Sequence, residues 1–374
     1  MKMKSIGIIC EYNPFHNGHL YHLNKIKEMY PDYTIILVMS GHFLERGDVS
    51  IINKWNKTDI ALEMGVDLVI ELPFVFASQS ADIFAYGAIS ILNYMNVEKI
   101  VFGSECNNID KLKKLACDSL ENKERIKKYL DNGYSYPAAL GKALNISLDN
   151  PNDILGMSYI KAINKLNSSI EPICIKRTND YNSKKTTGSI SSASSIRELL
   201  KNNKPIKDFV PEYVLNYIDN ISIDDYFEIL RYKIISSKNL SIYQTVDEGI
   251  ENRIKKYIFE VNSLEELINK VKTKRYTYNK LKRMFVHILC DFTKEEAKKF
   301  KKVKYIRVLG FNKKGSDYLS KIKKNIEIPI ITNYSNIHDE MLDLEFRVNS
   351  IYASIFKEKN HLSKLEYKHK PIIK

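Results

Sequence analysis

The chain has 374 residues, 44% of them hydrophobic, and is long enough for two domains with a substantial core. Its five cysteines lack a C-x-x-C spacing, its start turns polar too early for a signal peptide, and no apolar run approaches the ~20 residues of a membrane span, so we expect a cytoplasmic protein without a disulfide framework or a cysteine zinc site. The net charge of +13 excludes little, because it fits a polyanionic partner and a Lys-rich solvated surface equally well.

Short apolar runs in the first half of the chain alternate with amphipathic segments. The runs are β-branched and nearly continuous, as parallel strands covered on both faces should be, and they occupy residues 5–10, 34–39, 67–72, 99–103 and 172–176. Between them, residues 19–30 and residues 55–65, which follow Asn53, place apolar side chains on one face at the helical period. This order predicts an α/β fold with a Rossmann-like domain over residues 1–200, whose ligands bind at the carboxyl ends of a parallel sheet.

The character of the sequence changes near residue 200. Pro205 and Pro211 mark a linker or the start of a second domain. Three-to-four periodicity then predicts a mainly helical, basic domain over residues 201–374, with helices at 223–237, 245–259, 263–272 and 277–290, short strands at 304–310 and 328–333, and a loose tail at 362–374. Residues 1–200 hold 23 Lys and Arg against 22 Asp and Glu, and residues 201–374 hold 35 against 23, so a polyanion should meet the second half.

The segment IGIICEYNPFHNGHLYH (6–22) contains most of the functional information. It predicts a strand that passes through a Pro-containing turn into a helix opening near Asn17, where free backbone N–H groups and the helix dipole favour an anion. His16 and His19 should point to the same side, and Gly18 between them leaves room for a phosphate. We therefore expect a polyphosphate cradle whose two imidazoles stabilise charge at the attacked phosphorus.

Two histidines at this spacing could instead bind a metal ion, as imidazole often does. No cysteine or carboxylate completes a tetrahedral set on that helix, so we predict no protein-bound metal. A single histidine is also more often structural than catalytic. An H-x-G-H that follows the first strand of a βα unit favours the nucleotide interpretation.

Two later segments fit the same site. In TGSISSASSIRELL (187–200), hydroxyls that include Ser194 accompany a helix starting near Ser195 with Arg197 in its first turn, which suits the β- and γ-phosphates of ATP. A simple helix cap explains these serines nearly as well. In IKRTNDYN (175–182), Arg177 follows a predicted strand and could neutralise phosphate or cap a loop.

One basic segment of the second half alternates cations with tyrosines. KTKRYTYNKLKR (272–283) could hold RNA, with its cations on phosphates and its rings on unpaired bases; the residues are Lys272, Lys274, Arg275, Tyr276, Tyr278, Lys280, Lys282 and Arg283. A solvated helix face with both tyrosines packed inward fits the pattern about as well. Residues 298–307 and 313–324 are weaker candidates of the same kind.

The motifs resemble those of a known family. EYNPFHNGHLYH with a downstream SSASSIR is similar to the nucleotidyltransferase superfamily, in which an H-x-G-H motif and a Ser/Thr-rich segment bind ATP. More narrowly, GIICEYNPFHNGHLYHL, MSGHFLERGD (39–48), DLVIELPFVFASQSADIFA (67–85), PNDILGMSYIKA (151–162) and KRYTYNKLKR (274–283) resemble the bacterial tRNA(Met) cytidine acetate ligases. The resemblance implies a ligase that makes acetyl-adenylate and pyrophosphate from acetate and ATP. It then transfers the acetyl group to the wobble cytidine of elongator tRNA(Met), giving N4-acetylcytidine and AMP.

Carried over motif by motif, the resemblance places ATP contacts along the opening segment and at three later positions. They are Ile9, Cys10, Glu11, Tyr12, Asn13, Pro14, Phe15, His16, Asn17, Gly18, His19, Leu20, Tyr21 and His22, then Gly103, Asn152 or the neighbouring Asp153, and Arg177. His42 and Glu45 stand where the family usually has Asn and Gln, so a role for that loop is not carried over.

On this hypothesis acetate attacks the α-phosphorus in line, and His16 and His19 stabilise the transferring group. Arg177 and the segment 191–197 hold the leaving pyrophosphate, and Mg²⁺ accompanies ATP as its counterion. Two other functions share parts of the pattern. A small-molecule adenylyltransferase would use the same H-x-G-H chemistry but leaves the basic half unexplained, and a non-catalytic RNA-binding protein could retain a vestigial nucleotide site.

Overall fold

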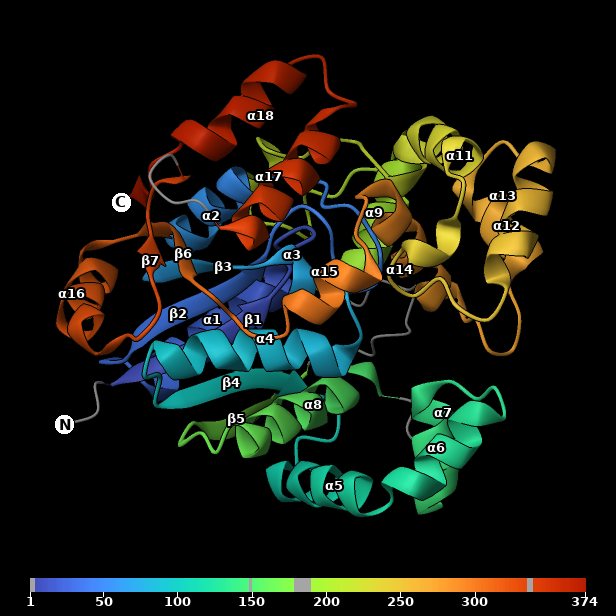
Figure 1. Ribbon diagram of the computed structural model, residues 1–374. Coiled ribbons are helices and arrows are strands. Elements are labelled where there is room, and N and C mark those ends of the chain that lie inside the picture. The colour runs from blue at the N-terminus through green and yellow to red at the C-terminus, as the bar shows by residue number, and fades with distance from the viewer. Residues whose placement is uncertain (1–3, 148–149, 178–189, 335–338) are drawn as a thin grey trace.

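A mostly parallel sheet forms the centre of the computed structural model, which describes residues 4–147, 150–177, 190–334 and 339–374. The eight strands have the order β5-β4-β1-β2-β3-β6-β7, with β8 beside β6 (Figure 1). The first five are parallel: β1 (Ser5–Cys10), β2 (Thr34–Ser40), β3 (Leu68–Leu72), β4 (Lys99–Ser104) and β5 (Glu171–Lys176). The predicted strands of the first half are confirmed, each end to within one residue.

Helices cover both faces of the parallel strands, which explains why those strands lack polar alternation. Ile36 and Val38 of β2 enter one hydrophobic core, while the alternating Ile35 and Leu37 enter another. The first core contains α4 (Ala81–Tyr94) and α8 (Pro151–Lys165), and the second contains α1 (Asn17–Met29) and α2 (Lys54–Glu63). α3 (Phe74–Ala77), α5 (Ile109–Glu121), α6 (Lys123–Asp131) and α7 (Tyr136–Leu144) complete this half.

The second half is mainly helical, as predicted. Its helices are α9 (Ala193–Lys201), α10 (Glu212–Leu215), α11 (Phe227–Ser236), α12 (Ile250–Tyr257), α13 (Leu264–Val271), α14 (Tyr278–Leu289), α15 (Lys294–Lys299), α16 (Lys313–Ile322), α17 (Glu340–Ala353) and α18 (Lys359–Lys368). The helix predicted at 245–259 begins only at Ile250, because Thr245, Glu248 and Gly249 have positive φ angles that an α-helix excludes. Among the described residues, no helix is long and apolar enough to cross a membrane.

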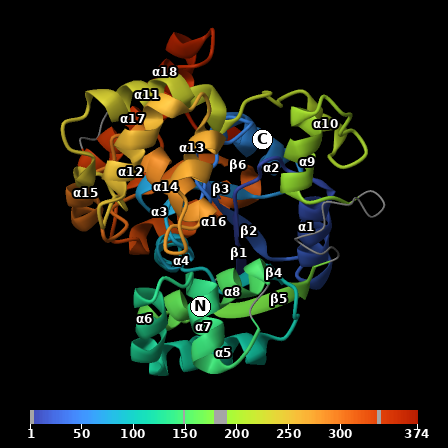
Figure 2. The same ribbon diagram turned by 90° about the vertical axis from the view of Figure 1, so that its right-hand side faces the viewer.

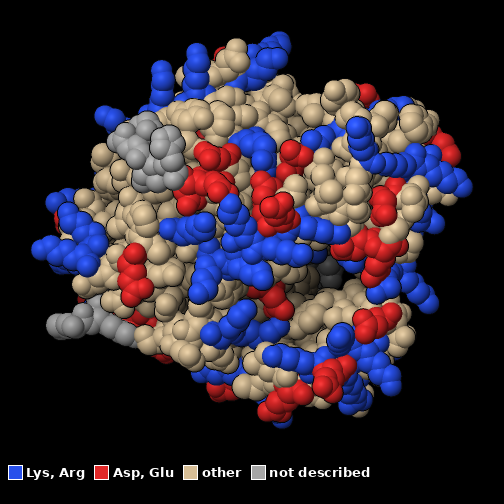
Figure 3. Space-filling model, in the orientation of Figure 1, with Lys and Arg blue, Asp and Glu red and all other residues tan. Residues whose placement is uncertain are grey.

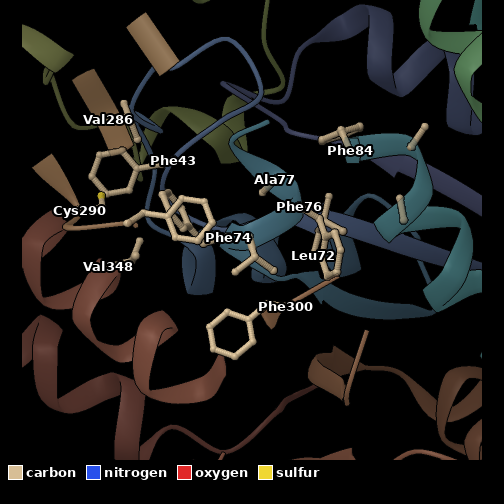
Figure 4. Close-up of a cluster of buried hydrophobic side chains, with 14 of the residues drawn as sticks. Phe43, Leu72, Phe74, Phe76, Ala77, Phe84, Val286, Cys290, Phe300 and Val348 are labelled. Atoms are coloured by element: carbon tan, nitrogen blue, oxygen red, sulfur yellow. The ribbon is translucent and has the colours of Figure 1, made fainter. Parts of the chain in front are cut away.

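The two halves share one sheet and one core. β6 (Ile306–Phe311) pairs antiparallel with β3, and β7 (Ile330–Ile331) and β8 (Ile372–Ile373) pair with β6. In Figure 4, Phe43 and Phe74 lie with Val286, Cys290 and Val348 from the second half. The domain boundary at residue 200 stays a prediction. Helix α9 runs across this position, and its Ile196 is buried in the hydrophobic core that also contains α1 and α2.

The expectation of a loose tail at 362–374 is wrong. Residues 359–368 form α18, and the buried Glu366 accepts a hydrogen bond from Lys54 Nζ at 2.8 Å and pairs with Arg307. Lys374 Nζ lies 3.0 Å from a carboxylate oxygen of Asp59. The basic composition of the tail concealed these partners, because they come from distant parts of the sequence.

Candidate nucleotide-binding and active site

The carboxyl ends of the parallel strands open into a cleft of about 1060 Å³. Its floor includes the β1–α1 turn, the end of β4 and the N-terminal ends of α8 and α9, and residues of α14 line its mouth. The space-filling view shows the surface hollowed between the second half and the α6–α7 region (Figure 3). Figure 2 shows α5–α7 and α11–α13 on opposite sides of the molecule.

His16 and His19 form a stacked pair at the start of α1. Their ring centroids are 3.8 Å apart at an interplanar angle of 23°. His16 caps the helix, its Nδ1 accepting from the Gly18 amide at 3.0 Å, and His19 Nδ1 accepts from the His16 amide at 3.3 Å. Because both Nδ1 atoms are acceptors, each neutral ring carries its proton on Nε2. Both rings line the cleft, so they present N–H donors to an oxyanion there.

The ring of the capping histidine gives a further reason for glycine at position 18. A Cβ at this position would lie 2.9 Å from Cε1 of His16, closer than atoms can pack. The glycine therefore makes room for that ring, and because it lines the cleft, room for a phosphate there stays a prediction.

Burial sets the charge of the histidines. Together with the positive charge of the nearby Arg177, it lowers the pKa of His16 to about 3 and of His22 to about 4. The rings are thus neutral hydrogen-bond donors at pH 7. In the parts of the chain that the structure describes, no three His, Cys, Asp or Glu side chains gather as metal ligands would.

Several polar atoms around this pair lack partners within the described structure. They are Nε2 of His22, Nε of Arg177 and Oγ of Ser191, all of them buried. Buried polar groups are normally hydrogen-bonded, so three unpaired ones in one cleft indicate a polar ligand.

Arg177 connects Gly103 with α8. A Cβ on Gly103 would lie 3.1 Å from Cγ of Arg177, and the guanidinium donates to Asn152 Oδ1 at 3.2 Å. Asp153 is turned away and accepts from Ser104 Oγ at 2.5 Å and from the Glu105 amide at 3.0 Å. Of the two neighbouring candidates for a nucleotide contact, Asn152 and Asp153, it is therefore Asn152 that lines the cleft.

The N-terminal end of α9 forms another wall. Ser192 caps the helix by accepting from the Ser195 amide at 3.2 Å, and the exposed Ser194 lines the cleft. Arg197 donates to the Asn13 carbonyl at 2.7 Å and lies 3.5 Å from Asp48, so it holds the Pro-containing turn in place. Residues 178–182 and 187–189 of the two predicted phosphate segments lie outside the described residues.

Four residues of the predicted opening segment do not line the cleft. Phe15 and Leu20 pack with the hydrophobic core, and Pro14 is buried in the turn. Asn17 donates its side-chain amide to the Asp208 carbonyl at 3.0 Å. The other ten, Ile9 to Asn13, His16, Gly18, His19, Tyr21 and His22, are brought together there.

The basic segment 272–283 is only partly exposed. Tyr276 is 4% exposed and its hydroxyl donates to the Asp247 carbonyl at 2.6 Å, so its ring cannot stack on a base as expected. Lys282 pairs with Asp48, and Arg283 Nη1 lies 3.2 Å from Glu45 Oε1. These two cations are therefore paired with carboxylates of the first half of the chain. Lys272, Lys274 and Arg275 remain exposed, with Tyr278 and Lys280 half-buried.

The second basic segment, residues 298–307, is also only partly exposed. Arg307 is buried against Glu366, but Lys298, Lys299, Lys301, Lys302 and Lys304 are exposed. Figure 3 shows Lys and Arg gathered over α15, beside the hollow.

Comparison with known proteins agrees with this geometry. Residues 3–367 match the model of the HIGH Nucleotidyl Transferase family. A tRNA(Met) cytidine acetate ligase of Caldicellulosiruptor saccharolyticus is 44% identical over 99% of this chain and 98% of its own, and one from a Geobacillus strain is 40% identical over 99% and 100%. This chain belongs to the tRNA(Met) cytidine acetate ligase family.

Solved structures of the family have the same fold. TmcAL of Thermotoga maritima, 31% identical, superposes with a TM-score of 0.91 in its apo form and 0.88 when bound to alpha-thio ATP, in each case over 99% of both chains. The resemblance seen in the sequence motifs is therefore confirmed.

Residues after β2 and β3 were missed as site residues. Glu45 and Arg46 follow β2 and line the cleft, as do residues 79–84, which follow β3. Burial raises the pKa of Glu11 to about 7, and its carboxylate accepts from the Glu45 amide at 2.7 Å. The rule that ligands bind at strand carboxyl ends, applied to every strand, would have found both segments.

Proposed function

We propose that this family member activates acetate with ATP as acetyl-adenylate and transfers the acetyl group to the wobble cytidine of elongator tRNA(Met). The observation that supports this most is the stacked His16–His19 pair, whose Nε2 donors face a cleft with unpaired buried polar atoms. A polyphosphate supplies the acceptors that such a site needs. The relatives named as tRNA(Met) cytidine acetate ligases, and the TmcAL bound to alpha-thio ATP, support the choice of substrates.

In the first step a carboxylate oxygen of acetate attacks the α-phosphorus, and the bond to the β-phosphate breaks to release pyrophosphate. His16 and His19 donate hydrogen bonds to the α-phosphate oxygens as negative charge builds there. Arg177 holds the leaving pyrophosphate, and Ser194 and Arg197 lie on the same wall. Mg²⁺ would enter with ATP as part of the substrate.

In the second step the N4 amine of cytidine attacks the acetyl carbon, AMP leaves with the electrons of the broken acyl–oxygen bond, and the proton that N4 gives up passes to the departing phosphate or to solvent. No covalent enzyme intermediate is needed, so catalysis consists of positioning and electrostatic stabilisation. Lys272, Lys274 and Arg275 are exposed, and Arg275 lines the cleft, so these cations are available to the backbone of a tRNA that enters it.

Mass spectrometry of tRNA nucleosides after incubation with ATP and acetate tests the whole proposal. We expect N4-acetylcytidine in elongator tRNA(Met) only when both small substrates are present. Acetate-dependent exchange of labelled pyrophosphate into ATP tests the first step alone. No exchange would favour a non-catalytic RNA-binding protein, and AMP transfer to a coenzyme precursor without tRNA would favour an adenylyltransferase.

A further inference from the structure

The part of the cleft lined by Gln79 and Tyr159, called its second lobe below, presents polar side chains that hydrogen-bond to no described residue. Gln79, between α3 and α4, is 4% exposed, and Tyr159 on α8 is 2% exposed. Both line the cleft. Over residues 4–147, 150–177, 190–334 and 339–374, neither the Gln79 amide nor the Tyr159 hydroxyl forms a hydrogen bond. Their polar groups are open to the cleft rather than sealed inside the protein, so they are available to hydrogen-bond a ligand that fills it.

Contacts between α4 and α8 bring the two side chains to the same lobe. Asp82, in the first turn of α4, accepts from Ser158 Oγ at 2.9 Å and from Lys161 Nζ at 2.8 Å. Gln79 comes shortly before Asp82, and Tyr159 directly follows Ser158. The hydrogen bond between Asp82 and Ser158 therefore holds the two segments together. The Tyr159 ring packs edge-on against Phe102 at 5.6 Å, which fixes its direction.

The second half of the chain supplies the third side of the lobe. Nε2 of the buried His287 lies 2.7 Å from the Ser78 carbonyl, and its Nδ1 lies 3.1 Å from Thr245 Oγ1. Thr245 has a φ of +67°, a conformation that β-branched residues rarely adopt. His287 thus holds a strained turn against Gln79, and the adjacent Gln244 also lines the cleft, its side-chain amide without a hydrogen bond to any described residue.

We propose that Gln79, Tyr159 and Gln244 form the pocket that receives the acceptor cytosine, an inference that rests on the proposed function. The three groups are neutral and supply both donors and acceptors, which matches the amine, ring nitrogen and carbonyl of cytosine. A carboxylate such as acetate offers acceptors only, so it would leave the amide oxygens unpaired. The same cleft is lined by the histidine pair and by the cations Arg275 and Lys280, so a base flipped out of a single-stranded loop would find the reacting groups and phosphate-binding cations together there.

Two variants that remove only the polar groups test the pocket: Gln79→Met and Tyr159→Phe. The affinity of each is measured for tRNA(Met) with cytidine and with uridine at the acceptor position. The wild-type protein should prefer cytidine by about tenfold or more, and each variant should lose most of that preference. Acetyl transfer should fall by a similar factor through kcat/KM for tRNA, and the acetate-dependent pyrophosphate exchange is followed in parallel. Tyr232→Phe, which removes an exposed hydroxyl from α11, is the matched control and should keep the cytidine preference.

If both variants keep the cytidine preference, the proposal that these side chains bind the cytosine is wrong. A wild-type protein without such a preference would also contradict it, as would loss of pyrophosphate exchange together with transfer, which would place the side chains in the nucleotide or acyl site. Absence of exchange in the wild-type protein would instead contradict the proposed function, while the affinity comparison would still decide the pocket.

Discussion

The two sides of the cleft are built in different ways. On the first side the main chemical groups are local: His16, Gly18 and His19 lie within four consecutive residues at the end of β1. On the second side the groups that matter are distant in sequence and bind the first half, as Lys282 binds Asp48 and Arg283 binds Glu45. Part of the positive excess of residues 201–374 therefore neutralises carboxylates of the first half, and a smaller part faces solvent for RNA.

The largest effect should come from breaking the buried ion pairs that join the halves. Glu366→Gln removes one of the two buried carboxylates that Lys54 and Arg307 share and leaves Glu71 alone against two buried cations, so we expect a loss of about 3–5 kcal/mol in the free energy of unfolding. Urea denaturation measures it. Glu358→Gln, at an exposed position of the same region, is the control. Equal stability of the two variants would show that α18 does not hold the sheet.

Removing one imidazole should separate the chemistry of the first side from RNA binding. His19→Ala is expected to lower acetate-dependent pyrophosphate exchange about 100- to 1000-fold, because one donor to the charged transition state is lost. Its affinity for tRNA should be retained, as measured by filter binding. His361→Ala, on the exposed face of α18, should change neither. Loss of tRNA binding with exchange intact would reverse the assignment of the two sides.

The histidine between the halves should make stability depend on pH. Burial lowers the pKa of His287 to about 4, whereas an unfolded histidine titrates near ~6.5. Below that value the unfolded chain takes up a proton that the folded chain does not, so stability is lost as the pH falls. His287→Gln should remove roughly 2 kcal/mol of the loss between about pH 6.5 and 5. Unfolding of the variant and of the wild-type protein at several pH values checks this, and equal slopes for the two would contradict it.

The smallest effect concerns the exposed cations. Lys272→Glu with Lys274→Glu should weaken tRNA binding by several-fold to about tenfold and reduce its salt dependence. Lys113→Glu with Lys114→Glu, an exposed pair on α5, makes the same charge change in the first half. If both pairs weaken binding equally, the RNA responds to total charge, and the segment 272–283 has no special role.

The sequence predicted what depends on neighbouring residues and missed what depends on distant ones. The β-branched runs placed the strands, and the H-x-G-H motif placed two rings side by side, because both patterns follow from backbone geometry. The inward direction of Tyr276 was one of two alternatives that the local pattern left open, and the burial of Arg307 depends on a partner that this pattern does not reveal. Gln79 belongs to the same group, since the cleft that it lines is completed by Tyr159 from α8 and by Gln244 from the second half.

The antiparallel pairing of β3 with β6 affects how this chain is made. Leu68 and Ile70 must wait for residues 308–311 before their edge of the sheet is covered, so most of the polypeptide has to leave the ribosome first. Until then an entirely buried strand, LVIEL, presents open backbone groups that can join other chains. Nascent chains stalled before β6 should therefore depend on chaperones, although their histidine motif is already complete.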